Sequence, residues 1–434
     1  MSATPSFPSV SPLSQRVEAL AAQVEPQVIA WRRDLHEHPE LGNREFRTAA
    51  LVAAHLRSLG FDEVRTEVAH TGVVALLKGG RPGGVVALRA DMDGLPVAEQ
   101  VDLPYASRAR AVWNGEEVGV MHACGHDCHV AILLGVATVL SALRAQIAGQ
   151  VKFIFQPAEE MPPEGEEGGA ELMIRQGALE HPTPQAIFGL HVTSRLPVGV
   201  IGYRPGPTMA SSDKLRITVQ GRQTHGAAPW LGVDPIVTSA QIVLGLQTIV
   251  SRNLDLNREP AVVTIGAIKG GVRENIIPDA VEMRGTIRSF DEGMRDEIHA
   301  RVTELAEGIA GAARAQCRVC ITRNYPVTYN DPALVEQMLP TLTRVASTGP
   351  RPMGIELVPK VTGAEDFSFF QRLVPGLFFF VGVTPPETDP AKAYSNHSPH
   401  FVADERGLEV GVRALAQLAL DFLASESHLS ATPD

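Results

Sequence analysis

The amino-acid sequence predicts an α/β protein, with a larger domain built on a central, mostly parallel sheet and a smaller α+β domain inserted into it. Continuously apolar runs alternate with helical segments in both outer parts of the chain, as expected for parallel strands that are buried on both faces. Between about residues 205 and 327 the pattern changes to strands of alternating polarity. The length of 434 residues suits about two to three domains.

Four apolar runs are predicted to be central strands of the larger domain. They are VVALRA, VKFIFQ, AIFGL and GLFFFVG. Three of these runs end at or shortly before candidate functional residues, namely Asp91, the pair Glu159 and Glu160, and His191. Ligands of open α/β sheets bind beyond the carboxyl ends of the strands. We therefore expect these four side chains to converge on one edge of the sheet.

The inserted part follows the order β-α-β-β-α-β, which is a ferredoxin-like topology. KLRITVQ, PAVVTIGAI, DAVEMRGTIRSF and CRVCITRNY are strand-like, the stretch 234–250 is helical, and a second helix follows from Asp291. We predict a first catalytic segment over residues 1–205, the inserted domain over 206–326 and a second catalytic segment over 327–434.

Charge and hydropathy argue against two classes of partner. The net charge is −11, which disfavours nucleic acid or an anionic membrane surface as the main partner. The longest apolar stretch, residues 130–143, is shorter than the roughly 20 residues that cross a bilayer. A secretion signal is not recognised, and four cysteines in so long a chain form no disulfide framework. We expect a soluble, cytoplasmic protein with reduced thiols.

Potential metal ligands gather in MHACGHDCHV, residues 121–130. Asp127 can cap the helix that follows, which would leave Cys124 and His126 in the loop at its N-terminus. A helix N-terminus favours a thiolate, so we favour Cys124 and His126 as metal ligands. The alternative is an inert, buried cysteine beside a capping motif. The neighbouring Cys128, His122 and His129 are assigned to packing.

Two adjacent carboxylates, Glu159 and Glu160, follow a strand in QPAEE. Adjacent residues point in different directions, so one carboxylate can bind a metal while the other serves as a general base. The alternative is a solvated turn. Two further patterns are rejected as metal sites. In HEHPE the second histidine follows too soon and Pro39 breaks the helix, and Cys317 and Cys320 would point to opposite faces of a strand.

Eight motifs together resemble one known family: RADMDGLP, HACGHD, QPAEE, GLHV, GRQTHGAAPW, RENIIPD, GAEDFS and NHSPHF. The chain resembles the aminoacylase/carboxypeptidase family of dinuclear metallohydrolases, and within it the amidohydrolase branch of hippurate hydrolases and auxin-conjugate (IAA-amino acid) hydrolases. More typical members carry His-x-Asp after the first strand and a bridging Asp later. This chain has Arg89-Ala-Asp91 and then Cys124-Gly-His126 instead, and this departure identifies the branch.

The resemblance implies two divalent metal ions per subunit, Zn²⁺ or Mn²⁺. Cys124 would bridge the two ions, and Glu159 would be the general base. Asp91 would orient a ligand histidine from behind, unless it is simply a buried cap. The remaining metal ligands implied by the resemblance are His126, Glu160, His191 and His397.

The resemblance also assigns roles to the inserted domain, as a dimerisation or lid domain. Asn275 and Arg288 match positions that hold the free carboxylate of the substrate, which a guanidinium can pair bidentately. The alternative is a satisfied pair at a sheet edge. His225 would complete the active site of a partner subunit and donate a hydrogen bond to the oxyanion. The alternative for His225 is a solvent-facing loop histidine.

These expectations describe a metal-dependent amidohydrolase that cleaves N-acyl amino acids into a carboxylic acid and a free amino acid, in a homodimer or dimer-based oligomer. A dipeptidase or carboxypeptidase of the same family is the alternative enzyme. A catalytically silent protein that binds N-acyl amino acids is the alternative from another class. Glu159 discriminates, because binding alone requires no general base. The acyl group and the metal stay open.

Overall fold

The computed structural model describes residues 11–429, which divide into two compact units. Unit 1 combines the chain up to Pro205 with Asn330–Val358 and the chain from Phe369 onwards, and unit 2 combines Gly206–Tyr329 with Pro359–Ser368. Unit 2 therefore takes in a short segment that the sequence analysis placed with the second catalytic segment. This segment is tied to unit 2 by a parallel bridge between Val361 and Met209.

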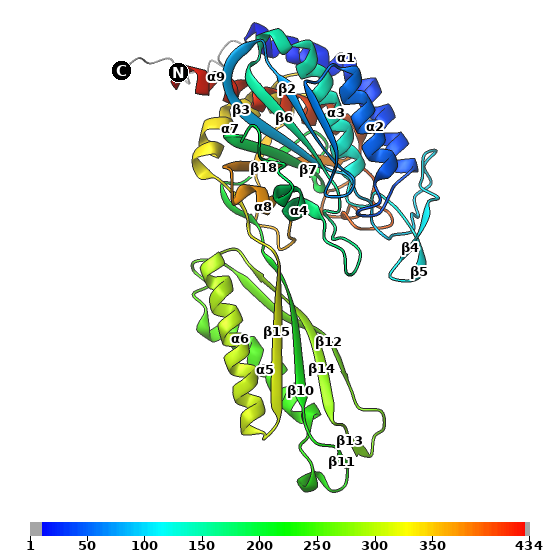
Figure 1. Ribbon diagram of the computed structural model, residues 1–434, viewed down its shortest axis with the longest axis vertical. Coiled ribbons are helices and arrows are strands. Elements are labelled where there is room, and N and C mark those ends of the chain that lie inside the picture. Colours follow the sequence, from blue (N-terminus) through cyan, green and yellow to red (C-terminus); the bar gives the residue numbers. More distant parts are fainter. Residues whose placement is uncertain (1–10, 430–434) are drawn as a thin grey trace. The chain divides into compact units, whose positions relative to one another are not determined.

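Unit 1 is built around an eight-stranded mixed sheet (Figure 1). The inner strands β6, β3, β7 and β18 are mutually parallel neighbours in that order, and they contain the four apolar runs that the sequence analysis selected. The strand β18 is buried along its whole length. In spatial order the strands are β1 (Glu63–Val68), β2 (Gly72–Lys78), β6 (Ala148–Gln156), β3 (Arg81–Asp91), β7 (Ala186–Pro197), β18 (Gly376–Thr384), β8 (Ile201–Tyr203) and β17 (Ile355–Leu357).

The helix α3 (His126–Ala142) lies in the middle of the helical layer of unit 1 and is buried over nearly all of its surface. Gly135 permits this packing, because a Cβ there would lie 2.7 Å from Val28 of α1 and 2.9 Å from Val412 of α9. The other helices of unit 1 are α1 (Pro12–Glu37), α2 (Phe46–Ser58), α4 (Gly169–Arg175), α7 (Pro332–Ser347) and α9 (Leu408–Leu429). No helix in the described part of the chain is long and apolar enough to cross a membrane.

Unit 2 has the predicted ferredoxin-like order β-α-β-β-α-β. Its four strands form an antiparallel sheet in the order β12-β14-β10-β15. Asp234 and Asp291 cap its two helices by accepting hydrogen bonds from backbone amides of the first turn. The elements are β10 (Ser212–Gln220), α5 (Pro235–Thr248), β12 (Ala261–Gly270), β14 (Ala280–Ser289), α6 (Glu292–Ala312) and β15 (Gln316–Tyr325).

Short elements complete the two units. A two-stranded sheet of β11 (Thr224–His225) and β13 (Ile276–Ile277) lies at one end of unit 2 (Figure 1). The remaining elements are the hairpin β4 (Arg110–Trp113) and β5 (Glu116–Gly119), the pair β9 (Gly206–Met209) and β16 (Thr328–Asn330), the helix α8 (Phe367–Gln371), the 3₁₀ turns at Arg144–Gln146, Pro229–Leu231 and Glu405–Gly407, and the π-helical turn Ile249–Asn253.

Candidate metal centre

Cys124 and His126 lie on either side of Gly125, at the point where α3 begins. Gly125 is the N-cap residue and has a φ of 93°, a left-handed conformation that glycine adopts readily. A Cβ on Gly125 would also lie 2.3 Å from Val192 Cγ2. The helix therefore starts two residues earlier than expected, so that His126 is its first residue and Asp127 lies inside its first turn rather than capping it.

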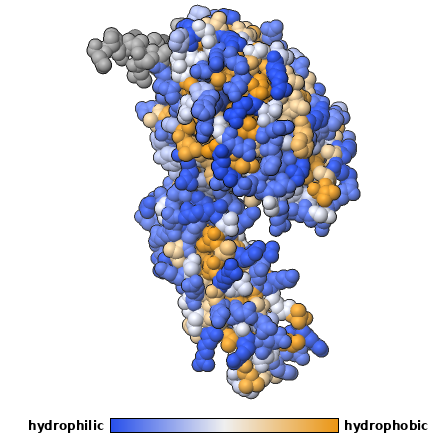
Figure 2. Space-filling model, in the orientation of Figure 1, coloured by the Kyte–Doolittle hydropathy of each residue, from blue (hydrophilic) through white to orange (hydrophobic). Residues whose placement is uncertain are grey.

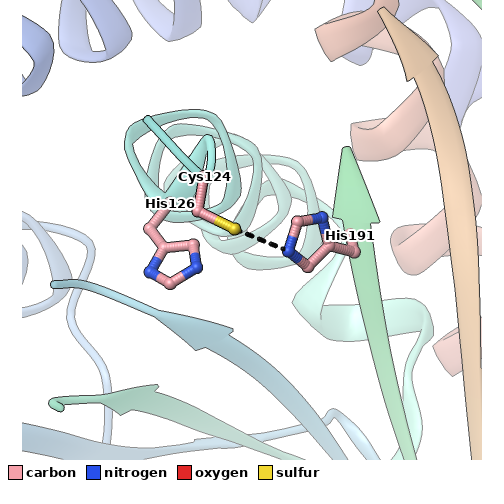
Figure 3. Close-up of side chains that lie close together, drawn as sticks. All are labelled: Cys124, His126 and His191. Atoms are coloured by element: carbon pink, nitrogen blue, oxygen red, sulfur yellow. Dashed lines mark hydrogen bonds between the residues drawn. The ribbon is translucent and has the colours of Figure 1, made fainter. Parts of the chain in front are cut away.

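Four of the side chains predicted as metal ligands meet around the thiol of the fifth, Cys124. The Cys124 Sγ lies 3.3 Å from His191 Nε2 and 3.2 Å from His397 Nε2, and His397 Nε2 lies 2.9 Å from Glu160 Oε1. Figure 3 shows Cys124 and His126 at the start of α3, with His191 facing them from a strand. Two groups of potential ligands share Cys124, and within each group the ligand atoms lie within 4.8 Å of one another: Cys124 with His126 and His191, and Cys124 with Glu160 and His397.

Backbone contacts orient the two histidines beside the thiol. His191 lies inside β7, which runs on past the predicted end of the strand to Pro197. Its Nδ1 donates to the Val192 carbonyl at 2.6 Å, so Nε2 is left to face the cluster. His397 has a φ of 72°, and its backbone N–H donates to the Ala123 carbonyl at 2.8 Å. The loop that carries His397 is thereby fixed to the loop that carries Cys124.

Asn396 reinforces this connection, and the sequence analysis assigned it no role. Its side-chain amide donates to the carbonyl of Cys124 at 2.9 Å and to that of Val192 at 3.1 Å. The available signal was its position directly before the histidine in NHSPHF.

Asp91 is completely buried, but it does not hydrogen-bond to a predicted ligand. It contacts His129 Nδ1 at 2.5 Å and accepts from Arg89 at 2.6 Å, while its nearest approach to His126 is 3.8 Å. His129, assigned to packing, accepts the Val192 N–H through Nε2 at 2.9 Å. Asp91 and His129 thus hold the strand next to His191.

The carboxylate that orients a predicted ligand is Asp93, which the sequence analysis missed. Asp93 Oδ1 lies 3.2 Å from His126 Nδ1, and Asp93 Oδ2 accepts the Glu160 backbone N–H at 2.9 Å. The signal for it was the repeated acidic residue in RADMD. A histidine bound through one nitrogen to a carboxylate presents its other nitrogen in a fixed direction.

The donor set fits divalent metal ions. His126 Nε2 is buried, and no described residue hydrogen-bonds to it, so this nitrogen is an orphaned donor or acceptor aimed into the cluster. Zn–S and Zn–N distances of about 2.3 and 2.05 Å at a tetrahedral angle would place sulfur and nitrogen about 3.5 Å apart, close to the two separations observed around Cys124 Sγ.

The pKa values of the cluster residues also indicate a site for a cation. Burial raises the pKa of the Cys124 thiol well above its usual value, and the carboxylates of Glu160 and Glu159 raise it further. Burial lowers the pKa of His126, but Asp91 and the hydrogen-bonded Asp93 outweigh it and raise that pKa to about 10. A buried site this rich in anionic groups favours a cation, and a bound metal ion would reverse the effect on the thiol.

Glu159 is 5% exposed and lies beside the predicted ligands. Its Oε2 is 4.0 Å from His126 Nε2, and its oxygens form a group with His126 and Glu160 whose ligand atoms all lie within 4.8 Å. The preceding residue, Ala158, has a φ of 51°. This turn brings both adjacent carboxylates to the cluster. The predicted roles, with one carboxylate as metal ligand and the other as general base, require this arrangement.

In unit 2, His225 and Asn275 are neighbours, whereas Arg288 is distant from both. His225 is exposed on β11 opposite Ile276, and the Gly226 N–H donates to the Asn275 carbonyl at 2.8 Å. Arg288 lies near the far end of β14 from Asn275, and the stretch from Ala280 to Arg288 covers about 26 Å at roughly 3.3 Å per residue. Within one chain, Asn275 and Arg288 are therefore too far apart to hold one carboxylate together.

Comparison with known proteins identifies relatives over nearly the whole chain. Thermostable carboxypeptidase 2 of Saccharolobus solfataricus is 39% identical over 411 residues, which cover 94% of this chain and 99% of the relative. IAA-amino acid hydrolase ILR1-like 2 of Arabidopsis thaliana is 36% identical over 411 residues, covering 93% of this chain and 87% of the relative.

A solved structure and a family model agree with these relatives. The YXEP protein of Bacillus subtilis, a dinuclear metal binding peptidase from the M20 family, superimposes with a TM-score of 0.76 at 34% identity, covering 93% of this chain and 99% of that one. The model of peptidase family M20/M25/M40 matches residues 87–421. The resemblance inferred from the eight motifs is thereby confirmed. The chain is a hydrolase of peptidase family M20/M25/M40.

Proposed function

We propose that this hydrolase is a metal-dependent amidohydrolase that cleaves N-acyl amino acids into a carboxylic acid and a free amino acid. The observation that carries the proposal is the buried carboxylate of Glu159 beside a second carboxylate, Glu160, that contacts the thiol-centred ligand cluster. A protein that only binds N-acyl amino acids has no use for a general base at that position.

Five residues would hold two divalent ions, Zn²⁺ or Mn²⁺. Cys124 would be the shared ligand, because it belongs to both ligand groups. A thiolate suits zinc, and the carboxylate and imidazole ligands suit manganese as well. When bound, the two ions supply Lewis-acid chemistry at the scissile carbonyl. The full set is Cys124, His126, Glu160, His191 and His397.

Glu159 then moves the proton that amide cleavage requires. Its carboxylate takes a proton from the attacking water and delivers it to the nitrogen of the leaving amino acid, because an amide anion is a very poor leaving group. Asp93 keeps His126 in one orientation through Nδ1. The burial of Glu159 keeps competing water away from this proton transfer.

Arg288 would bind the free carboxylate of the substrate. Its guanidinium is half-buried, and no described residue hydrogen-bonds to it. Burial lowers the pKa of this guanidinium, while Asp213 favours its charged form. An anion that pairs with the fork of Arg288 bidentately would satisfy these donors.

His225 and Asn275 would come from a second copy of the chain, since they lie far from Arg288 within one copy. The surface of unit 2 supports such a pairing. The strand β12 is an edge strand with unpaired backbone groups, and Figure 2 shows hydrophobic residues exposed on this unit. Around β12 and α5 the exposed apolar side chains are Ile236, Val237, Leu244, Val262, Ile268 and Val272.

A carboxypeptidase is the second candidate, because one of the relatives with the highest identity carries that name. Both substrates end in an α-carboxylate that Arg288 could bind. They differ on the other side of the scissile bond, where a peptide offers an amino acid residue and an N-acyl amino acid offers a plain acyl group. Substrate comparison therefore decides between the two activities.

The test is a panel assay on protein reconstituted with Zn²⁺ or Mn²⁺. N-acetyl, N-benzoyl, indole-acetyl and long-chain acyl amino acids are compared with dipeptides and longer peptides, and the released amine is measured. We expect kcat/KM for at least one acyl class to exceed that for every peptide by about tenfold, or about 1.4 kcal/mol in transition-state binding. Preference for peptides would establish the carboxypeptidase, and binding without turnover would establish the silent binder.

A further inference from the structure

The turn that presents Glu159 and Glu160 has an unusual backbone on both sides. Ala158 has a φ of 51° and Met161 a φ of 84°, and neither residue is glycine. The left-handed region is unfavourable for a residue with a side chain, and such a conformation persists where surrounding contacts impose it. Contacts around Ala158 and Met161 must therefore hold this turn in place.

Two buried carboxylates hold alternate amides of this turn. Glu45 Oε1 accepts the Ala158 N–H at 2.8 Å, and Asp93 Oδ2 accepts the Glu160 N–H at 2.9 Å. The Glu160 amide belongs to the peptide bond that follows Glu159, and the Ala158 amide belongs to the peptide bond that precedes Ala158. The backbone is therefore held on both sides of the Ala158–Glu159 pair, which restricts the direction of the Glu159 side chain.

The carboxylate of Glu45 is committed to this turn rather than to its own helix. Glu45 is the N-cap residue of α2, but its side chain makes no capping hydrogen bond. The first turn of α2 is instead capped by Glu40, whose two oxygens accept the Arg47 and Thr48 N–H groups at 2.9 Å each. Glu45 is completely buried, and the Thr71 hydroxyl donates to its Oε2 at 2.5 Å.

We propose that Glu45 is a positioning residue for the reaction, acting through the Ala158 amide to fix Glu159 in the geometry of a general base. This inference rests on the proposed role of Glu159. Thr71 supports Glu45 from behind, and Gly42 leaves room for the turn, since a Cβ there would lie 3.1 Å from Ala158 Cβ. Among the described residues, the Glu45 carboxylate hydrogen-bonds to Thr71 and Ala158 and to none of the predicted ligands.

The hydrogen bond to Ala158 does not require a charged carboxylate. Burial raises the pKa of Glu45 to about 8, and the nearby charge of Asp93 adds to the shift. A protonated Glu45 would carry its proton on Oε2, where the Thr71 hydroxyl can accept, and Oε1 would still accept from Ala158. Glutamine offers the same oxygen acceptor, so Glu45→Gln is a conservative variant of this interaction.

The experiment compares Glu45→Ala, Glu45→Gln and the control Glu40→Ala in the metal-reconstituted full chain. We expect Glu45→Ala to lower kcat about 10- to 100-fold with little change in KM, as for other displacements of about 1 Å. Glu45→Gln should keep kcat within about threefold of the unmodified protein. Glu40→Ala removes two helix-capping bonds, so it should lower the melting temperature while kcat stays unchanged.

Amide hydrogen exchange over residues 157–161 provides a readout that does not depend on turnover. Glu45→Ala should speed exchange in this peptide, whereas Glu40→Ala should speed exchange at the start of α2 only. Unchanged kcat or unchanged exchange in a folded Glu45→Ala protein would overturn the inference. If Glu45→Ala does not fold, Thr71→Val removes the support of Glu45 and should show the same pattern, and its failure to do so would overturn the inference equally.

These readouts also separate this inference from the proposed function. Absence of turnover by the unmodified protein on the whole panel would refute the proposed amidohydrolase. Hydrogen exchange alone would then test whether Glu45 fixes the turn at residues 157–161. Turnover by the unmodified protein, with Glu45→Ala equally active, would refute the positioning role and leave the amidohydrolase intact.

Discussion

Glu159 and Glu160 are consecutive carboxylates, but their surroundings differ. Glu160 Oε1 lies 2.9 Å from His397 Nε2, and His397 lowers the pKa of Glu160 against the raising effect of burial. Glu159 lies farther from the ligand histidines, with its Oε2 4.0 Å from His126 Nε2. Glu160 thus contacts the ligand cluster directly, whereas Glu159 lies beside it.

Glu159→Gln should therefore leave both metal ions bound while turnover falls by about 10² or more, as expected when a general base is lost. Glu160→Gln is the matched comparison, because it should lower the metal content itself. Metal analysis and kcat on the same preparations check both statements. Near-normal turnover of Glu159→Gln at full metal content would contradict its role.

Cys124→Ser should lower the metal content per chain, because a hydroxyl is a much poorer anionic bridge than a thiolate. Cys128 is the control, since it is also buried but belongs to none of the ligand groups found among the described residues. Cys128→Ser should keep the stoichiometry of the unmodified protein. Equal metal content in both variants would make Cys124 a packing residue.

The sequence predicts a site residue where the residues next to it along the chain form a recognisable motif or strand. Cys124 and His126 stand in one motif, and Glu159 follows a strand. Asp91 and Asp93 could not be separated, because which carboxylate hydrogen-bonds to His126 depends on where α3 begins. That start is set by the turn at Gly125, and Asp127 gave a competing capping signal.

The start of α3 is an element whose geometry depends on one glycine. Gly125→Ala would force Ala into a left-handed φ, at about 1–2 kcal/mol, and would push Val192 away from 2.3 Å, which adds about 1–3 kcal/mol. Gly115→Ala is the control, since Gly115 has a φ of 84° and open space around it. Urea unfolding should show the larger loss for Gly125→Ala. Equal losses would mean that Val192 moves freely.

In unit 2, a buried ion cluster joins β10 to α6. Asp213 contacts Arg295 at 2.5 Å and His299 at 2.7 Å. Burial raises the pKa of Asp213, but the bonds from His299 and Arg295 outweigh this and lower it. A carboxyl whose pKa is lower in the folded state stabilises that state above the unfolded pKa of about 3.9. This stabilisation is lost as the pH falls through the folded value.

Asp213→Asn should destabilise unit 2 by roughly 3–5 kcal/mol at pH 7, because Arg295 would lose its buried charge partner and keep only the more exposed Glu292. At acidic pH, once the pH has fallen through the lowered folded pKa of Asp213, the variant and the unmodified protein should approach equal stability. Asp296→Asn, which breaks an exposed pair with Arg323, should have little effect. Urea titrations at both pH values test the sign, and a difference that grows in acid would contradict it.

At the level of elements, continuous apolar runs predicted the four inner strands, and alternating polarity predicted the sheet of unit 2. The outer strands were not selected. The strand β2, GVVALLK, is apolar up to its final lysine, but no candidate functional residue directly follows it in the sequence. The strands β8 and β17 have three residues each. Strands this short form because neighbouring strands of the sheet pair with them. The local sequence contains no pattern that predicts this pairing.

At the scale of the whole molecule, the separation of His225 and Asn275 from Arg288 predicts sharing of residues between copies. Glu159→Ala and His225→Ala homodimers should both be nearly inactive, since losing an oxyanion donor costs about 10² to 10³ in rate. A purified heterodimer of the two variants should regain one of its two sites, from Glu159 of one chain and His225 of the other. Heterodimers as inactive as their parents would place His225 within its own chain.

The connection of β7 to β18 also has a consequence for biosynthesis. These neighbouring parallel strands are separated by roughly 180 residues of chain, which a ribosome adds in about 10–40 s. The four-stranded sheet of unit 2 lies entirely within that interval, so a nascent chain can complete it while β7 still lacks its partner. His397 emerges later than β18. The proposed ligand cluster can therefore close only after β18 and the loop of His397 have been synthesised, and loading of the proposed metal ions would follow that point.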